Sequence, residues 1–416
     1  MTLHKAAPAA FFALAGWVVL PGAAQTTGFS EAGKAALSRQ LSDAVARGDT
    51  PGVVAAVVGR DGMFYQGTAG RLDVAHNTAM PSNAIFSIAS MTKPVTSVAV
   101  MMLAEEGKLK LDDPVSKYLK GFNDLRVLTK FNEKDGTYET RPARRPMTIR
   151  HLLTHTSGIA YPFANPIEAR LTQATKKDEW ELPLLSDPGD KWSYGPSTRV
   201  LGMIVEKITG QPLETWFQAR IFQPLGMVDT SYAVPLSKQA RVPTLHRRVN
   251  GLLQEERRTK IPSTPRAPFG GDGGLYSTVD DYGKFIRMLI HGGSLGPVKV
   301  LSESSVKMMG ENNIGSVFVE LQPDADKSLT RPFPLGAGHD KFGLGFQIAA
   351  KTDDPQDAKF RSAGSMSWAG LFNTEFWIDP VKQIGGIQLM QVLPFYDEGA
   401  IRTLRGFEES VYRNLR

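Results

Sequence analysis

Strand-forming patterns stand at the two ends of this sequence, with a long, mostly helical segment between them. Strands are expected at residues 51–59 and 63–69, which flank the turn Arg60-Asp-Gly62, and again at 342–349, 371–378 and 384–392. Helices are expected outside them at 31–48 and 398–414. Strands so far apart in the sequence can share one sheet only if the end of the chain folds back beside its beginning. We therefore expect an α+β fold, in which an antiparallel sheet formed from both chain termini is flanked by helices and interrupted by a large, mostly helical insertion domain.

The segment between the strands defines the predicted domains. We assign residues 1–24 to a signal peptide, 25–110 and 341–416 to an α/β sheet domain, and 111–340 to a mostly helical domain. Helical spacing of apolar residues recurs at 149–155, 198–207, 213–222 and 278–289. An active site is expected in the cleft between the two domains.

The first 24 residues have the pattern of a secretory signal. Lys5 precedes an apolar run at residues 9–20, and Gly22-Ala-Ala24 supplies the small residues that favour cleavage near Ala24. The run is shorter than the roughly 20 residues that span a bilayer. We expect a periplasmic or secreted protein with no membrane span in the mature chain, and an uncleaved anchor is the alternative.

The composition limits the chemistry and the partners. The sequence has no cysteine, which excludes disulfides, thiol nucleophiles and thiolate metal sites. Its net charge is +6, and loss of Lys5 with the signal leaves +5 (6 − 1). Basic clusters at 141–145, 247–248 and 257–260 stand in loop-like sequence without interleaved aromatic residues. They therefore indicate a solvated surface, and we expect no nucleic-acid partner.

The strongest candidate for chemistry is the stretch 86–106. Its apolar residues recur at helical spacing and predict a helix with one buried stripe that begins near Ser90, has Pro94 in its first turn and ends at Gly107. Ser90 and Lys93 are three residues apart and face the same way. A lysine with a lowered pKa can take the proton of a serine hydroxyl, and the free N–H groups of the helix start can bind an oxyanion.

Two further stretches can complete such a site. Tyr194 stands in a turn-rich run just before a helix, where a phenol beside a lysine can relay a proton. Ser367-Trp-Ala-Gly-Leu371 opens a strand, and its small residues Ala369 and Gly370 allow a backbone to approach a ligand closely. Taken alone, the first also fits a half-buried aromatic under a loop, and the second an ordinary turn with a packing tryptophan.

Together these runs resemble the serine β-lactamase and penicillin-binding-protein superfamily, and most closely its esterase branch, the family VIII carboxylesterases. The resemblance covers almost the whole mature chain. It rests on Ser90-Met-Thr-Lys93, on residues 106–115, 151–158, 188–194 and 270–277, and on Trp368-Ala-Gly370, which follow one another in the family's order.

The resemblance implies a β-lactamase-like fold and an acyl-enzyme mechanism that needs no cofactor. By this resemblance Ser90 would be the nucleophile, and Lys93 and Tyr194 would share the roles of general base and acid. The backbone N–H groups of Ser90 and Leu371 would form the oxyanion hole. The substrate-binding positions would be Trp368, Ala369, Gly370 and Pro196.

Two departures from the family pattern concern the substrate. Trp368 stands where members that process lactams and peptides have Lys or His, and Pro196 stands where they have an Asn that bonds an amide. Loss of both polar groups favours a neutral, fairly apolar, small-molecule ester. The alternatives are a β-lactamase or D-amino-acid peptidase, including side activity on cephalosporins, and a non-catalytic penicillin-binding-like module. No oligomeric state is predicted.

Two other motifs are set aside. Residues 292–296 match the G-x-S-x-G elbow of α/β-hydrolases, but a helix precedes them and Pro297 follows, so Ser294 is not expected to be a nucleophile. His151 and His155 have helical spacing for zinc, but Leu152 replaces the glutamate of a metalloprotease and no third ligand is evident. No metal is therefore expected.

Overall fold

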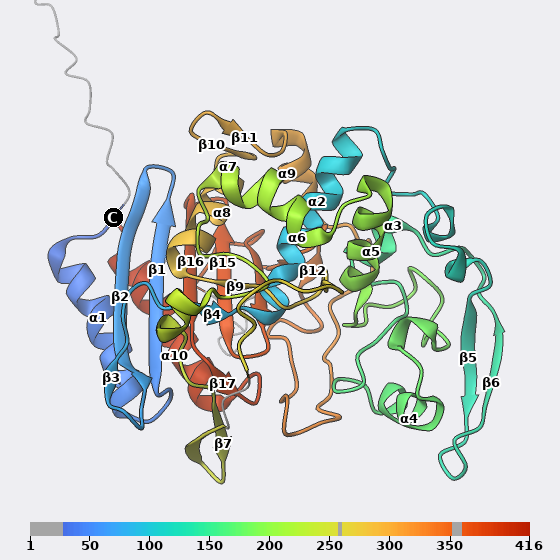
Figure 1. The fold of residues 1–416 in the computed structure, drawn as a ribbon, viewed down its shortest axis with the longest axis horizontal. Helices are drawn as coiled ribbons and strands as arrows, with labels where there is room; N and C mark the ends of the chain where they lie inside the picture. Colours follow the sequence, from blue (N-terminus) through green and yellow to red (C-terminus); the bar gives the residue numbers. More distant parts are fainter. Residues whose placement is uncertain (1–27, 257–259, 352–359) are drawn as a thin grey trace, which may run out of the picture.

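An eight-stranded antiparallel sheet is the central element of the fold (Figure 1). The computed structural model describes residues 28–256, 260–351 and 360–416. The predicted signal peptide lies outside these ranges, as do residues 257–259 of the third basic cluster. The strands are β1 (Gly52–Gly59), β2 (Gly62–Asp73), β3 (Thr78–Ala79), β12 (Lys341–Phe342), β13 (Gln347–Ile348), β14 (Met366–Gly370), β15 (Thr374–Asp379) and β16 (Ile384–Leu389).

The two ends of the chain meet inside this sheet. The strand order is β12-β13-β14-β15-β16-β1-β2-β3, so β1 from the N-terminal part pairs with β16 from the C-terminal part. Their register runs from Val54 opposite Leu389 to Gly59 opposite Ile384. The prediction of an antiparallel sheet formed from both termini is confirmed.

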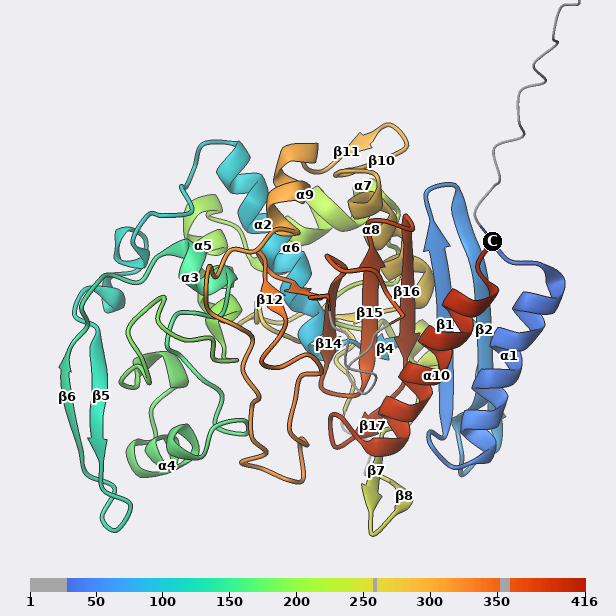
Figure 2. The same cartoon turned by 180° about the vertical axis from the view of Figure 1, so that it is seen from behind.

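Helices α1 (Glu31–Ala46) and α10 (Glu398–Asn414) cover one face of the sheet (Figure 2). Side chains of a strand alternate between its two faces, and every residue of β1 is buried. Val53, Ala55 and Val57 pack in a cluster with Leu41 of α1 and Phe407 of α10. The alternate residues of β1 face the second, larger core on the other side.

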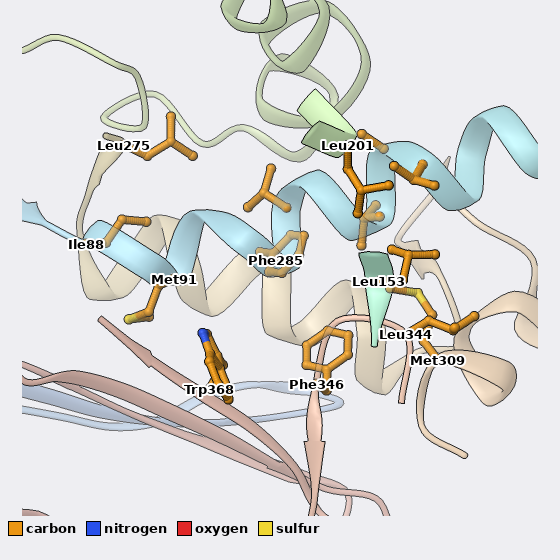
Figure 3. Packing of buried hydrophobic residues seen from close by; sticks show 14 of the residues in the cluster. Ile88, Met91, Leu153, Leu201, Leu275, Phe285, Met309, Leu344, Phe346 and Trp368 are labelled. Atoms are coloured by element: carbon orange, nitrogen blue, oxygen red, sulfur yellow. The ribbon is translucent and has the colours of Figure 1, made fainter. Parts of the chain in front are cut away.

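That larger core surrounds helix α2 (Thr92–Glu105). Figure 3 shows Leu201 and Leu275 on one side of α2, and Phe285, Phe346 and Trp368 on the other. Residues 92–103 of α2 are all buried, so the expectation of a single buried stripe is wrong. The physical reason is position, because α2 lies between the sheet and the helical insertion and has no solvent-facing side over this length.

The insertion between the two halves of the sheet contains most of the helices. These are α3 (Ile149–Leu153), α4 (Pro166–Thr175), α5 (Ser197–Thr209), α6 (Leu213–Phe217), α7 (Gln223–Leu225), α8 (Val279–Ile290) and α9 (Glu303–Met309). Short 3₁₀ helices lie at Val115–Lys117, Lys120–Phe122, Glu179–Glu181 and Leu236–Arg241, and a π-helix at Gln218–Phe222. No helix in the described ranges is both long and apolar enough to cross a membrane.

The insertion also contains strands that the sequence analysis missed. The hairpin β5 (Arg126–Phe131) and β6 (Tyr138–Pro142) lies at one end of the molecule, farthest from α1 (Figure 1). Most of its residues are half-buried or exposed, so its sequence lacks a clear apolar alternation. The other short strands are β4 (Phe86–Ser87), β7 (His246–Val249), β8 (Leu252–Glu255), β9 (Tyr276–Ser277), β10 (Ser294–Leu295), β11 (Val298–Lys299) and, after the sheet, β17 (Val392–Leu393).

All three predicted C-terminal strands have different bounds. The strand predicted at 384–392 ends at Leu389 of β16, and Val392 begins the separate strand β17. The strand predicted at 371–378 begins only at Thr374, because β14 ends at Gly370 and residues 371–373 form the turn into β15. The strand predicted at 342–349 is reduced to the ends that form β12 and β13. Gly345, with φ of 99°, bends the chain between them.

Candidate active site

Ser90 lies in a tight turn immediately before α2. A 3₁₀ turn spans Ala89–Met91, and the α-helix proper begins at Thr92. Ala89 has φ of 41°, a left-handed conformation that costs a non-glycine residue about 1–2 kcal/mol. The turn is fixed by the neighbouring backbone, since the N–H of Ile88 donates to Leu275 O at 3.0 Å. The chain thus holds a strained backbone at the residue before the candidate nucleophile.

The three predicted reactive side chains meet at the Ser90 hydroxyl. Lys93 Nζ is 3.1 Å from Ser90 Oγ, and the Tyr194 hydroxyl is 2.7 Å from the same oxygen. Lys93 and Tyr194 are both buried. A serine within hydrogen-bond reach of a base and of a second proton donor has the geometry of an activated nucleophile.

The surroundings of Lys93 favour the neutral amine. Burial lowers the pKa of Lys93 to about 7, with Arg199 acting in the same direction and Asp272 opposing it. Besides Ser90, the amine contacts the Tyr161 hydroxyl at 3.2 Å and the backbone oxygen of Asp272 at 2.9 Å. A neutral amine has two N–H donors and one lone pair. It can donate to Tyr161 and Asp272 and accept the Ser90 proton.

Tyr161, Asp272 and Arg199 form a network behind Lys93 that the sequence analysis did not identify. The Tyr161 hydroxyl donates to Asp272 Oδ2, and Arg199 Nε donates to Asp272 Oδ1 at 2.9 Å. Burial opposes the charge of Asp272, but Lys93 and Arg199 keep the pKa of this carboxyl below its usual value. No spacing rule connects Asp272 with Tyr161, 111 residues away.

Tyr194 belongs to a buried aromatic cluster. Its ring lies 5.2 Å from that of Trp368 and 5.1 Å from that of His155, measured between centroids. Burial raises the pKa of the Tyr194 phenol well above 10, more than its hydrogen bond to Ser90 lowers it. The phenol therefore keeps its proton near neutral pH, and Lys93 is the candidate base.

Gly370 brings the run Trp368-Ala-Gly370 against the Ser90 turn. A Cβ atom on Gly370 would lie 2.3 Å from the backbone oxygen of Ile88, so no larger residue fits between β14 and the turn. Leu371 follows directly and lines the same cavity as Ser90. This approach is compatible with the predicted oxyanion hole, whose two N–H groups belong to Ser90 and Leu371.

A cavity of about 900 Å³ opens over Ser90. Its walls come from the insertion, from the loop around residue 334 and from β14, and are largely apolar. They include Tyr161, Phe163, Trp180, Met203, Phe269, Phe333, Trp368, Ala369, Leu371, Phe372 and Phe395. Of the predicted substrate-binding residues, Trp368 and Ala369 line the cavity. Gly370 and Pro196 are buried beside it, and Pro196 precedes the first residue of α5.

The first basic cluster serves the site structurally. Arg141 and Arg144 donate to the buried carboxylate of Asp187, with Arg144 Nε at 2.8 Å. Arg145 Nη1 donates to Asp190 Oδ1 at 2.7 Å. The cluster lies at the solvent-exposed surface, as expected, and its guanidinium groups also fasten β6 and the following loop to the segment that leads to Tyr194.

The motifs that were set aside occupy other structures. Ser294 begins the two-residue strand β10 after α8, so the strand-turn-helix context of a hydrolase elbow does not occur there. His151 Nδ1 accepts the Thr148 N–H at 3.2 Å at the start of α3. His155 lies beyond that helix and packs against aromatic rings.

Comparison with known proteins gives consistent matches over the described fold. The family model named Beta-lactamase matches residues 37–408. Protein Rv1367c of Mycobacterium tuberculosis is 34% identical, over 90% of this chain and 93% of the relative. Lovastatin esterase of Penicillium rubens is 27% identical, over 89% and 96%. A mutant of simvastatin synthase from Aspergillus terreus superposes with a TM-score of 0.77 at 25% identity, covering 93% of this chain and 98% of the other.

Proposed function

Since the chain belongs to the beta-lactamase family, whose fold serves serine hydrolases and acyltransferases, we propose that it is a carboxylesterase that acts through an acyl-enzyme on Ser90. One observation carries this proposal. The Ser90 hydroxyl is within hydrogen-bond distance of both the Lys93 amine and the Tyr194 hydroxyl, beneath a largely apolar cavity. These groups supply a nucleophile, a base and a proton carrier in one place.

Acylation begins when Ser90 Oγ attacks the ester carbonyl carbon. The neutral Lys93 amine takes the hydroxyl proton as the new C–O bond forms. The negative charge moves to the carbonyl oxygen, where the N–H groups of Ser90 and Leu371 stabilise it. The bond to the alcohol oxygen then breaks, Tyr194 protonates that oxygen, and Lys93 returns a proton to Tyr194. The products are a free alcohol and an acyl-Ser90 ester.

Deacylation repeats these roles with water. A water molecule replaces the alcohol, gives its proton to the Tyr194 and Lys93 pair, and attacks the acyl carbon. Ser90 Oγ leaves and regains its proton, which releases a carboxylic acid. When a second alcohol takes the place of water, the same step transfers the acyl group to that alcohol.

The nature of the cavity supports an ester over a lactam or peptide. Trp368 contributes an apolar wall packed on Tyr194, and Pro196 offers no side-chain donor. The name of the relative lovastatin esterase describes the same reaction class. The runner-up is a β-lactamase or D-amino-acid peptidase, which the same acylation residues can serve. A non-catalytic penicillin-binding-like module is the remaining alternative.

Substitution of Ser90 tests the proposal, with Ser294 as the matched control. We expect Ser90→Ala to lower kcat/KM on a small chromogenic ester by at least about a thousandfold, since the covalent step is lost. Ser294→Ala removes a hydroxyl from β10 and should keep nearly full activity. Unchanged turnover by folded Ser90→Ala protein contradicts the assignment, and loss of turnover in Ser294→Ala revives the elbow hypothesis.

Two further measurements separate the alternatives. Mass spectrometry after treatment with an organophosphonate should show one adduct on wild-type protein and none on Ser90→Ala. Absence of any adduct on folded wild-type protein favours the binding module. Comparison of kcat/KM on a neutral ester, a cephalosporin and a D-Ala peptide decides among the reactions, and a dominant peptide rate rejects the esterase.

A further inference from the structure

The cavity over Ser90 has a polar branch on the sheet face that α10 covers. Glu375 of β15 lies directly opposite Ala369 of β14, and both line the cavity. Leu404 of α10 and Arg361 line the same branch. Figure 2 shows α10 crossing in front of this face of the sheet. We call the part of the cavity lined by Glu375, Arg361, Leu404 and Tyr396 the branch, and Ala369 lines the same cavity.

The carboxyl of Glu375 is buried without a hydrogen-bond partner for Oε1 in the described part of the chain. Only 9% of the residue is exposed. Gln388 of β16, opposite Glu375 in the sheet register, also has no partner for either amide atom among these residues. Buried polar groups are nearly always bonded, so a carboxyl that faces a cavity in this condition indicates a missing polar ligand.

Two other polar side chains that line the cavity, Arg361 and Gln347, already have hydrogen-bond partners. Arg361 Nε and Nη2 donate to the two carboxylate oxygens of Glu408, each at 3.0 Å. Gln347 Nε2 donates to Leu335 O at 2.6 Å. The Tyr396 hydroxyl accepts the Leu335 N–H at 2.9 Å, which leaves its own proton available. The branch therefore offers the Glu375 carboxyl and the Tyr396 O–H to a ligand.

Burial favours the uncharged form of Glu375. Burial raises the pKa of Glu375 to about 8, and Glu408 acts in the same direction, while Arg361 opposes them. A protonated carboxyl has one donor and an acceptor oxygen. A hydroxyl group of a ligand also donates one hydrogen bond and accepts another, so it can bond to both oxygens of the protonated carboxyl. A carboxylate ligand would accept from the O–H but leave the acceptor oxygen of Glu375 unbonded, and an alkyl chain would leave the whole carboxyl unbonded.

We propose that this branch is a subsite for a hydroxyl group of the substrate, and that Glu375 is the residue that determines this specificity. The inference rests on the proposed esterase function, because the branch belongs to the cavity of Ser90. Ala369 precedes Leu371 by two residues, or roughly 7 Å along a strand. In the substrate, the hydroxyl should therefore be separated from the ester carbonyl by about four to eight atoms of the chain.

Matched ester pairs test this proposal. One pair places the hydroxyl on the acyl part, as p-nitrophenyl hexanoate and 6-hydroxyhexanoate. The other places it on the alcohol part, as the butanoates of hexan-1-ol and hexane-1,6-diol. In one pair, wild-type kcat/KM should favour the hydroxylated ester by about tenfold, the effect of one net hydrogen bond of about 1.4 kcal/mol. The pair in which the hydroxylated ester is preferred identifies whether the branch binds the acyl part or the alcohol part of the substrate.

Variants at Glu375 assign the effect. Glu375→Leu should remove the preference in both pairs, and Glu375→Gln, which keeps a donor and an acceptor, should retain part of it. Glu398→Leu, at an exposed position at the start of α10, is the control and should keep the full preference. In wild-type protein, hexane-1,6-diol should also slow organophosphonate labelling of Ser90 more than hexan-1-ol does. This measurement does not depend on the folding of any variant.

The outcomes that overturn the subsite differ from those that overturn the esterase. Equal preference in wild type and folded Glu375→Leu in both pairs overturns the subsite while the plain esters are still cleaved. A larger gain with a 6-aminohexanoate ester, lost in Glu375→Gln, also overturns it, because the branch would then bind a cation. Absence of cleavage of every ester overturns the proposed function itself.

Discussion

The charge of Asp272 should set the pH at which the enzyme becomes active. Tyr161 bridges Lys93 Nζ and Asp272 Oδ2, which places the carboxylate about 5 Å from the amine. A negative charge there favours the protonated amine and so raises the pKa of Lys93 against the effect of burial. The substitution Asp272→Asn removes this charge and keeps an oxygen that can accept from Tyr161.

The size of the effect follows from the separation of the charges. Two unit charges about 5 Å apart interact by about 3 kcal/mol at an effective dielectric constant of about 20. About 1.4 kcal/mol corresponds to one pH unit, so loss of the carboxylate should move the titration of Lys93 about 2 pH units towards acid. Arg199 loses its partner in this variant, and its unopposed charge acts in the same direction.

The pH dependence of kcat/KM on a neutral ester measures this shift. In the wild type the rate should rise with pH and be half-maximal near 7, as the Lys93 and Tyr194 pair loses its proton. In Asp272→Asn the rising limb should move about 2 pH units lower. The control is Arg199→Gln, which should move the limb to higher pH, because Arg199 lowers the pKa of Lys93. A limb that stays in place in both variants refutes the assignment of Lys93 as the titrating base.

Two further predictions concern residues that support the site. Tyr161→Phe removes the acceptor of one Lys93 N–H, so kcat should fall by about 10–100-fold while KM changes little. Steady-state assays measure both constants, and an unchanged kcat would show that Tyr161 does not orient the amine. Asp187→Ala leaves Arg141 and Arg144 without their shared carboxylate and should lower the free energy of unfolding in urea by about 1–3 kcal/mol. The control Asp135→Ala removes an exposed carboxylate, and equal losses in the two variants disprove a special role for the Asp187 ion pairs.

The sequence alone was sufficient to predict the features that depend on periodicity and on motif order. The strand patterns at both ends led to the observed sheet, and the pattern at 398–414 matches α10 residue for residue. The position of Ser90 before a buried helix followed from Pro94 and the apolar spacing. These features are local, because each depends on residues within one or two turns of each other.

Features that depend on tertiary contacts could not be read in the same way. Asp272 and Glu375 are both acidic residues near glycine or aromatic neighbours, and nothing local distinguishes their environments. One accepts two hydrogen bonds beside Lys93, and the other has an unbonded carboxyl oxygen in a cavity. Similarly, α2 shows an amphipathic pattern in sequence, and only the insertion packed against it explains why its polar residues are buried as well.

The site couples the two ends of the chain. Ser90 follows the N-terminal strands, whereas Gly370 and Leu371 belong to the C-terminal ones, and the β1 and β16 pairing is the connection between them within the sheet. The approach of Gly370 to Ile88 leaves no space for a side chain, so a small displacement of β14 would separate the two proposed oxyanion donors. Tyr161 and Tyr194 come from the insertion and close the third side. The proposed nucleophile, oxyanion donors and proton carrier therefore meet only when both sheet halves and the insertion are assembled, which ties the proposed activity to the complete fold.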